Sequence, residues 1–341
     1  MYKKEYILKW IKSKKSEKLV STSNIFGNIE ITIENVKYTI KDNSDNLKII
    51  LESKSMDNRK LNEYFFKLYA YINIVVGYYP KLLSGVEFDV KNSAEKYKTG
   101  EKHIHNDVCF TCRISSDNFK KSYGKFLNLY NKISFQIDYY SIATSKIGDW
   151  YCQIAIVNIL QCLDGLYNCL EITEKKRYYL TKKQTEKIQK KVKNIGLSNI
   201  TRSKNTKDML KLRLEQSVIN INEENYDTKL TNIFNDIESK YKVFHFENDE
   251  KFRKFIIKCK KTRNKFSHAS NEINNEFNGL ESTFYLYKLI LVFRLLIIDE
   301  IGLGKLIDRE LLKRLIINIG IFKCKMLIDR SLNKEGGNNG Q

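Results

Sequence analysis

The chain has 341 residues, of which 42% are hydrophobic and 12% aromatic. This is enough apolar material for a packed core, so the composition excludes a chain that is disordered throughout, and the length favours two domains. The formal net charge is +20, which favours an anionic partner, although a coding bias toward Lys, Asn and Ile is an alternative explanation of the charge.

The first part of the chain is predicted to be rich in β-strands. Residues 28–40 alternate apolar and polar side chains over much of their length, which is the period of a half-buried strand. Further strands are expected at residues 47–51, 85–90, 108–114 and 134–140, and an aromatic-rich helix at residues 62–76. We therefore expect residues 1–148 to form an N-terminal β-rich domain.

From residue 149 onward the pattern becomes helical. Residues 150–172 are apolar nearly all round, which predicts a central, buried helix with Asp149 as its N-cap. Further helices are expected at residues 181–194, 208–218, 228–241, 249–266, 280–301 and 308–319, with a loop at residues 198–207. Gly302-Leu303-Gly304 ends the helix before it. The predicted class is α+β: a helical bundle over residues 149–330 follows the β-rich domain, and residues 331–341 form a disordered tail.

Two runs hold much of the positive charge. Residues 171–213 contain 14 Lys or Arg against 4 Asp or Glu, and residues 251–268 contain 8 Lys or Arg and no acid. Such runs either bind a polyanion or form a solvated helix face. If they bind RNA, the lysines that we expect to contact it are Lys190, Lys191, Lys193, Lys258, Lys260, Lys261 and Lys265.

The sequence predicts a cytoplasmic protein. Its start lacks the apolar run of a secretory signal, and its most hydrophobic stretch, residues 289–298, is too short to span a bilayer and contains Arg294. Seven cysteines spread over the chain are then expected to be reduced thiols.

One predicted helix carries the residues that could perform chemistry. In residues 249–266, an arginine, Arg263, falls within an apolar stripe and so needs an anionic partner, a wet cleft or a subunit interface. The apolar members of this stripe are Phe252, Phe255, Ile256, Cys259 and Phe266. Asn264 lies four residues before His268, so these two share a face. On an ideal helix His268 lies roughly 160° from the stripe, so Arg263 and His268 converge only if the helix ends or distorts near Ser267.

Arg263-Asn264-Lys265-Phe266-Ser267-His268 resembles the Arg-polar-x3-His motif of the HEPN superfamily, and the order of helices around it resembles the HEPN domain of ApeA-like anti-phage proteins. The resemblance implies a metal-independent endoribonuclease that acts by abortive infection. It further implies that two HEPN domains pair and that their motifs meet in one cleft, so that this chain is a homodimer. The β-rich region is then expected to sense a phage-derived trigger.

The chemistry of these side chains fits RNA cleavage. The 2′-hydroxyl of RNA is an internal nucleophile, a histidine can transfer protons near neutral pH, and an arginine can stabilise the charge that develops on phosphate. We therefore assign Arg263, Asn264 and His268 as candidate catalytic residues, with no metal and no other cofactor.

Two alternatives remain. The first is a non-catalytic RNA-binding or regulatory protein that uses the same basic helices. The second is a zinc-stabilised DNA-binding factor, in which His103, His105, Cys109 and Cys112 would hold the metal. The spacing of this set is poor for zinc, because on a strand Cys109 and Cys112 point to opposite faces. No glycine-rich phosphate loop is present in the sequence, so we expect no nucleotide cofactor.

Overall fold

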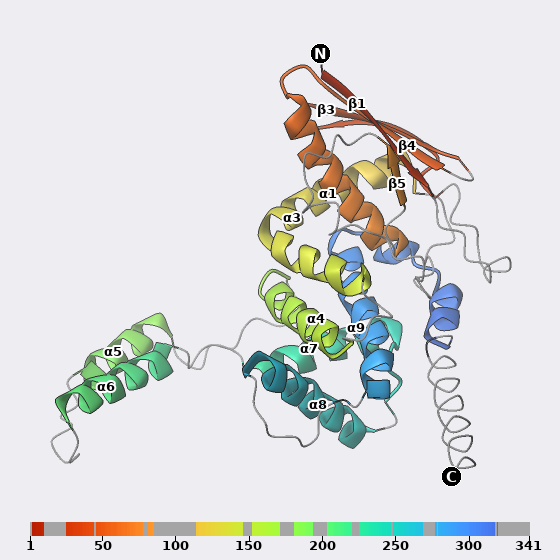
Figure 1. The fold of residues 1–341 in the computed structure, drawn as a ribbon. Helices are drawn as coiled ribbons and strands as arrows, with labels where there is room; N and C mark the ends of the chain where they lie inside the picture. Colours follow the sequence, from red (N-terminus) through yellow and green to blue (C-terminus); the bar gives the residue numbers. More distant parts are fainter. Residues whose placement is uncertain are drawn as a thin grey trace, which may run out of the picture.

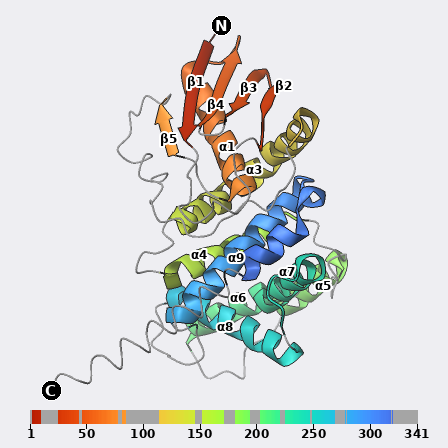
Figure 2. The same cartoon turned by 90° about the vertical axis from the view of Figure 1, so that its right-hand side faces the viewer.

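A computed structural model describes residues 2–9, 25–43, 46–77, 81–84, 114–145, 152–170, 181–193, 203–219, 225–246, 248–268, 277, 279–317 and 319. A β-sheet lies at one end of the molecule and a group of helices at the other, with two long helices between them (Figures 1 and 2). The predicted α+β class is therefore confirmed. The predicted strand at residues 85–90, the predicted strand at residues 108–114 except its last residue, and the predicted tail lie outside the described residues.

The sheet is antiparallel, with the strand order β2-β3-β4-β1-β5. Its strands are β1 (Tyr2–Lys9), β2 (Asn28–Ile33), β3 (Val36–Asp42), β4 (Asn46–Ser53) and β5 (Lys81–Ser84). Alternate side chains such as Tyr38, Ile49 and Leu51 are buried on the face that meets the helices. The expectation of a strand at residues 47–51 is confirmed by β4.

The prediction of one strand over residues 28–40 is wrong, because this segment is a hairpin of β2 and β3. Glu34 and Asn35 form the turn, and both have positive φ, 49° and 63°. Two positive φ angles in a two-residue turn match the twist of the flanking strands.

Two helices connect the sheet to the rest of the molecule. Helix α1 (Asn58–Val76) contains the predicted helix at residues 62–76; Asp57 caps its start, and Gly77, at φ 94°, ends it. Helix α3 (Ser116–Ser145) packs on α1, where the ring of Tyr71 lies 5.3 to 5.5 Å from three aromatic rings of α3. The predicted strand at residues 134–140 is wrong, since this segment belongs to α3. Its buried side chains, Ile133, Ile137 and Tyr140, recur at helical spacing, and Phe135 is exposed.

The second half of the chain is helical, as predicted. Its helices are α4 (Cys152–Tyr167), α7 (Tyr226–Tyr241), α8 (Asp249–His268), α9 (Gly279–Glu300), the short η3 (Gly304–Leu306) and a final helix over residues 309–317. Helix α9 is the central one: residues 289–298 are all buried, as their hydropathy predicted. Gly302, at φ 84°, ends it, and the Leu303 amide donates to the Ile298 carbonyl at 2.9 Å.

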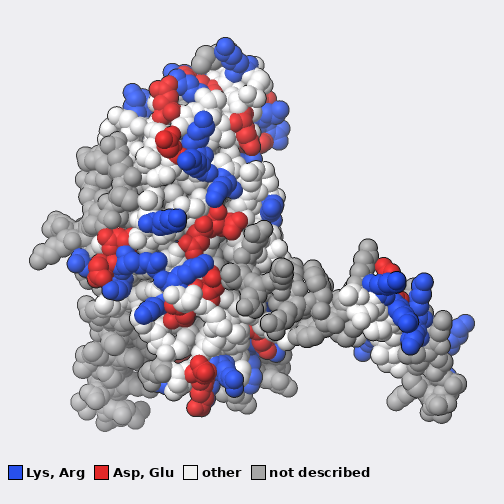
Figure 3. Space-filling model, turned by 180° about the vertical axis from the view of Figure 1, so that it is seen from behind, with Lys and Arg blue, Asp and Glu red and all other residues white. Residues whose placement is uncertain are grey.

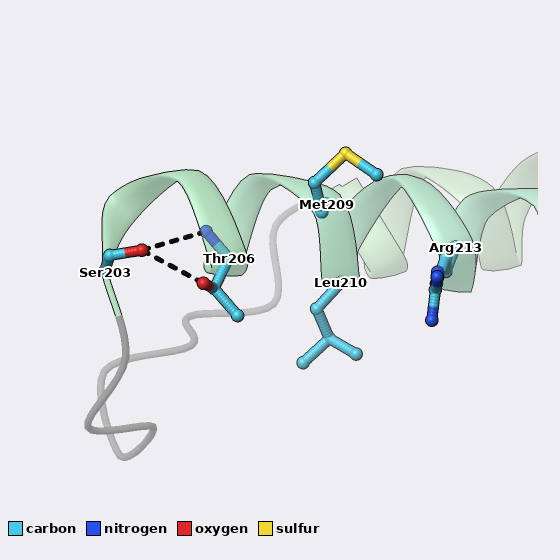
Figure 4. A pocket seen from close by; sticks show the side chains of 5 residues that line it. All are labelled: Ser203, Thr206, Met209, Leu210 and Arg213. Atoms are coloured by element: carbon cyan, nitrogen blue, oxygen red, sulfur yellow. Dashed lines mark hydrogen bonds between the residues drawn. The ribbon is translucent and has the colours of Figure 1, made fainter.

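A helical hairpin projects from this body (Figure 1). It consists of α5 (Lys182–Lys193) and α6 (Lys204–Ile219), which pack on each other and not substantially on any other described element. The prediction of a loop at residues 198–207 is wrong from Lys204 onward. The Ser203 hydroxyl accepts the Thr206 amide at 3.4 Å and so starts α6 one turn early (Figure 4).

The sheet side and the helical side share one packed core. Helix α3 packs on α4 and α9, and α1 packs on α9. Arg294 of α9 is 1% exposed and donates to the carbonyls of Ile74 and Val75, at the end of α1, at 2.6 and 2.5 Å. These contacts join residues on both sides of the predicted boundary at residue 148, which stays a prediction.

Within the described part of the chain, no helix has the length and hydropathy needed to cross a membrane. The described cysteines Cys152, Cys162, Cys169 and Cys259 are thiols rather than disulfides, as the sequence predicts.

Candidate active site

Helix α8 presents one face to the core of the bundle. The Asn248 side chain caps its start by accepting the Lys251 amide at 2.9 Å. Phe255, Ile256 and Cys259 are buried, and the fully buried Thr262 accepts the amide of Phe277 at 3.1 Å. The predicted apolar stripe is therefore present over most of the helix, but Phe266 at its end is 37% exposed.

Arg263 occupies the junction of three helices. Its guanidinium carbon lies 4.6 Å from the ring centre of Tyr226 in α7, and its Nη2 lies 3.9 Å from a carboxylate oxygen of Asp164 in α4. Lys229 of α7 donates to the other oxygen of Asp164 at 2.9 Å. The sequence required an anionic partner, a wet cleft or an interface for Arg263, and the structure provides the first of these.

The contacts of Arg263 leave its donors unused. Its Nε is buried and has no hydrogen-bond partner among the described residues, and 3.9 Å from Nη2 to Asp164 is too long for a hydrogen bond. The side chain is 30% exposed. A guanidinium with open donors at a partly exposed position is suited to bind an anion.

Two ionisable side chains near Arg263, Tyr226 and Cys259, stay protonated. Burial raises the pKa of the Tyr226 hydroxyl well above its usual value, and burial also raises the pKa of the Cys259 thiol. Both groups are therefore protonated near neutral pH, so neither is a suitable base or nucleophile. The Tyr226 hydroxyl has no hydrogen-bond partner among the described residues.

Asn264 and His268 lie on a different side of α8 from Arg263. The helix runs without interruption to His268, so it does not end before Ser267. Five residues of regular helix separate the directions of Arg263 and His268 by about 140°. The geometry that would let them converge within one chain is therefore absent from the backbone of α8. Asn264 is half-buried, and the side chain of His268 lies outside the described part.

The predicted RNA-binding lysines fall into two groups. Lys258 and Lys260 already have acidic partners, Glu281 at 2.7 Å and Asp227 at 2.7 Å. The exposed members are Lys190 and Lys191 on α5 and Lys261 on α8. Lys265 lies with its Nζ 5.9 Å from the Phe266 ring, and the side chain of Lys193 lies outside the described part.

The sequence analysis missed Asp164, Tyr226 and Lys229, which come from helices far from Arg263 along the chain. One signal was available: Asp164 is the sole charged residue of α4, and an acid in an otherwise uncharged helix requires a partner. The choice of partner depends on helix packing, which the local pattern does not give.

No group of three or more metal-ligating side chains occurs in the described residues. The candidate zinc residues His103, His105, Cys109 and Cys112 lie outside them.

A comparison with protein families found that residues 157–305 match the family described as Apea-like HEPN. No curated protein and no solved structure matched the chain. The matched region begins within α4 and ends in η3, so it includes Asp164, Tyr226, Arg263 and His268. The resemblance predicted from the sequence is thereby confirmed: residues 157–305 are similar to the Apea-like HEPN family.

Proposed function

We propose that this chain is a cytoplasmic, metal-independent endoribonuclease that acts in anti-phage defence by abortive infection. The observation that carries the proposal is Arg263, a partly exposed arginine in the HEPN-like region whose guanidinium makes no hydrogen bond to the described residues. Asn264 and His268 follow it on the same helix. An arginine of this kind can hold a phosphate and stabilise its developing charge.

The reaction uses the substrate's own nucleophile. A base removes the proton of the 2′-hydroxyl, the 2′-oxygen attacks phosphorus, and the bond from phosphorus to the 5′-oxygen breaks as an acid protonates that oxygen. The 5′ fragment then ends in a 2′,3′-cyclic phosphate and the 3′ fragment begins with a 5′-hydroxyl. His268 supplies the proton transfers, Arg263 stabilises the charge on phosphate, and Asn264 orients the histidine or a phosphate oxygen.

The active form in this proposal is a homodimer. Positions 263 and 268 lie about 140° apart around one regular helix, and one histidine rarely serves as both acid and base. Two copies that bring their α8 helices together would supply two histidines to one cleft.

RNA is held by basic side chains outside the reacting centre. On the face drawn in Figure 3, cations and anions are interspersed over the body, whereas the charged side chains drawn on the projecting hairpin are mostly cations. Lys190 and Lys191 on α5 are exposed there, and Lys193 belongs to the same run. Lys261 and Lys265 extend the site along α8, and Lys258 and Lys260 would join them only by leaving Glu281 and Asp227.

The N-terminal β-rich part acts in this proposal as the sensor of a phage-derived trigger. Its contacts to α9 support a route by which binding at the sheet would alter the helices. The competing proposal is a non-catalytic RNA-binding or regulatory protein, which the same exposed lysines also favour.

Cleavage of a labelled RNA with and without excess EDTA separates these proposals. We expect cutting in EDTA, 2′,3′-cyclic phosphate ends, no cutting of DNA, and loss of cutting in Arg263→Ala and His268→Ala with the fold retained. Light scattering should give twice the mass of one chain. Binding without cleavage would favour the non-catalytic protein, and activity that needs a divalent ion would contradict the mechanism.

A further inference from the structure

Two neighbours hold the Arg263 guanidinium without using its hydrogen-bond donors. The Tyr226 ring contacts it through its face, 4.6 Å from the guanidinium carbon, and a ring face attracts a cation through its quadrupole. Asp164 attracts it across 3.9 Å, beyond hydrogen-bond length. The side chain is therefore oriented while its N–H groups make no hydrogen bond to the described residues.

Both neighbours are themselves fixed in place. Asp164 is anchored by Lys229, whose Nζ lies 2.9 Å from it and whose side chain is 17% exposed. Tyr226 is the first residue of α7, and the Asn225 side chain caps that helix by accepting the Thr228 amide at 2.8 Å. The carboxylate and the ring thus flank the guanidinium from two helices that pack on α8.

We propose that Asp164 and Tyr226 are positioning residues that pre-align Arg263 for the phosphate of RNA. This inference rests on the ribonuclease function proposed above. A pre-aligned guanidinium needs no reorganisation as charge develops on the phosphate, and misplacement of a reacting group by about 1 Å can cost roughly 100-fold in rate.

Asp164 has opposite effects on binding and on catalysis, which gives its role a distinctive signature. Its negative charge lies next to the cation that would hold the phosphate, so it disfavours the binding of RNA. Its attraction orients the same cation, so it favours cleavage. Removing the charge should therefore slow cleavage without weakening affinity, whereas damage to the fold would lower both.

The test compares Asp164→Asn with Asp236→Asn in the full-length chain. Asp236 is a partly buried carboxylate near the other end of α7, paired with Lys240 at 2.8 Å. We expect single-turnover cleavage of a labelled RNA to fall about 100-fold in Asp164→Asn, with the Kd for that RNA unchanged or lower. Asp236→Asn should keep both quantities within about twofold of wild type.

A second pair of variants tests the ring by itself. Tyr226→Phe keeps the ring and removes a hydroxyl that has no hydrogen-bond partner in the described structure, so it should cleave at about the wild-type rate. Tyr226→Leu removes the aromatic face and should lose activity as Asp164→Asn does. Thermal unfolding of each variant shows whether it is folded. If Asp164→Asn is not folded, the comparison of Tyr226→Phe with Tyr226→Leu tests the positioning role.

The outcomes separate this inference from the function on which it rests. If the wild-type chain cleaves RNA and both Asp164→Asn and Tyr226→Leu cleave it at the same rate, the positioning role is overturned. The ribonuclease proposal would stand in that case. Weaker RNA binding in a folded Asp164→Asn would also overturn the positioning role, because the carboxylate would then support binding. A wild-type chain that cuts no RNA would overturn the ribonuclease proposal and this role with it.

Discussion

Two arginines of the helical half differ in burial and in how their N–H groups are used. Arg294 is 1% exposed, and main-chain carbonyls at the end of α1 accept its N–H groups. Arg263 is 30% exposed, and its Nε has no acceptor among the described residues. A buried cation must satisfy its donors within the protein, whereas a cation that serves a substrate must keep donors available. Arg294 is therefore structural in character, whereas Arg263, which is partly exposed, is the candidate for binding a substrate phosphate.

The first prediction concerns Gly304, just after α9. A Cβ at this position would collide with Asp299 Oδ1, and that carboxylate cannot move easily because it accepts the Tyr241 hydroxyl and pairs with Lys240 at 3.3 Å. We expect Gly304→Ala to lower the free energy of unfolding by about 1–3 kcal/mol in a denaturant titration.

Gly124→Ala is the matched control for Gly304→Ala. Gly124 lies inside α3, and a Cβ there would have nothing within 4 Å. An alanine in a helix loses less chain entropy on folding, so we expect the free energy of unfolding to rise by about 0.4–1 kcal/mol. Equal effects of the two substitutions would contradict the collision at Asp299.

At the scale of elements, long segments with clear periodicity could be predicted from the sequence, whereas a tight turn between two strands was missed. Helices α1, α7, α8 and α9 follow the apolar spacing of the sequence. The β2–β3 hairpin was missed, although its apolar residues change from odd positions in β2 to even positions in β3, which is the mark of a two-residue turn.

The candidate site was predictable only in part, for a related reason. Arg263 stands out because it interrupts an apolar stripe on its own helix. Asp164 and Tyr226 become its neighbours through packing among three helices, and no periodicity within one helix encodes that. Local patterns therefore identified the candidate helix but not the side chains that lie against its arginine.

The second prediction concerns the α5–α6 hairpin as an RNA-binding element. Replacing the exposed Lys190 and Lys191 together by alanine should weaken RNA binding at low salt. The slope of log affinity against log salt should become shallower by about 0.7 for each lost contact with single-stranded RNA. Because the hairpin does not pack substantially on any other described element, the cleavage rate at saturating RNA should stay the same.

Lys120 and Lys121 provide the control for this pair. They are adjacent, exposed lysines on α3, far from the hairpin along the chain. Their replacement by alanine removes the same charge and should leave the salt slope unchanged. If both double variants weaken binding equally, net charge rather than the hairpin determines affinity.

At the scale of the whole molecule, the sheet and the helices depend on the same core. Helix α9 contacts α1 and α3 on one side and α4 and α7 on others. A fragment that begins at residue 149 would lack the α1 and α3 side chains that cover α9 and would expose Arg294. The proposal that the N-terminal part controls the helical part is therefore tested better in the full chain, with single substitutions where α9 contacts α1.

The last prediction uses Arg294→Met for that purpose. The methionine keeps an unbranched apolar stem but donates no hydrogen bond, so the carbonyls of Ile74 and Val75 lose the donors that Arg294 provides. An unsatisfied buried carbonyl costs about 1–3 kcal/mol, so the free energy of unfolding should fall clearly, whereas Arg314→Met, at an exposed site, should change it by less than about 0.5 kcal/mol. Hydrogen exchange should show loss of protection in both α1 and α9. If protection fell in α9 alone, the two halves would open independently, and the contact could not transmit a signal from the sheet to the site.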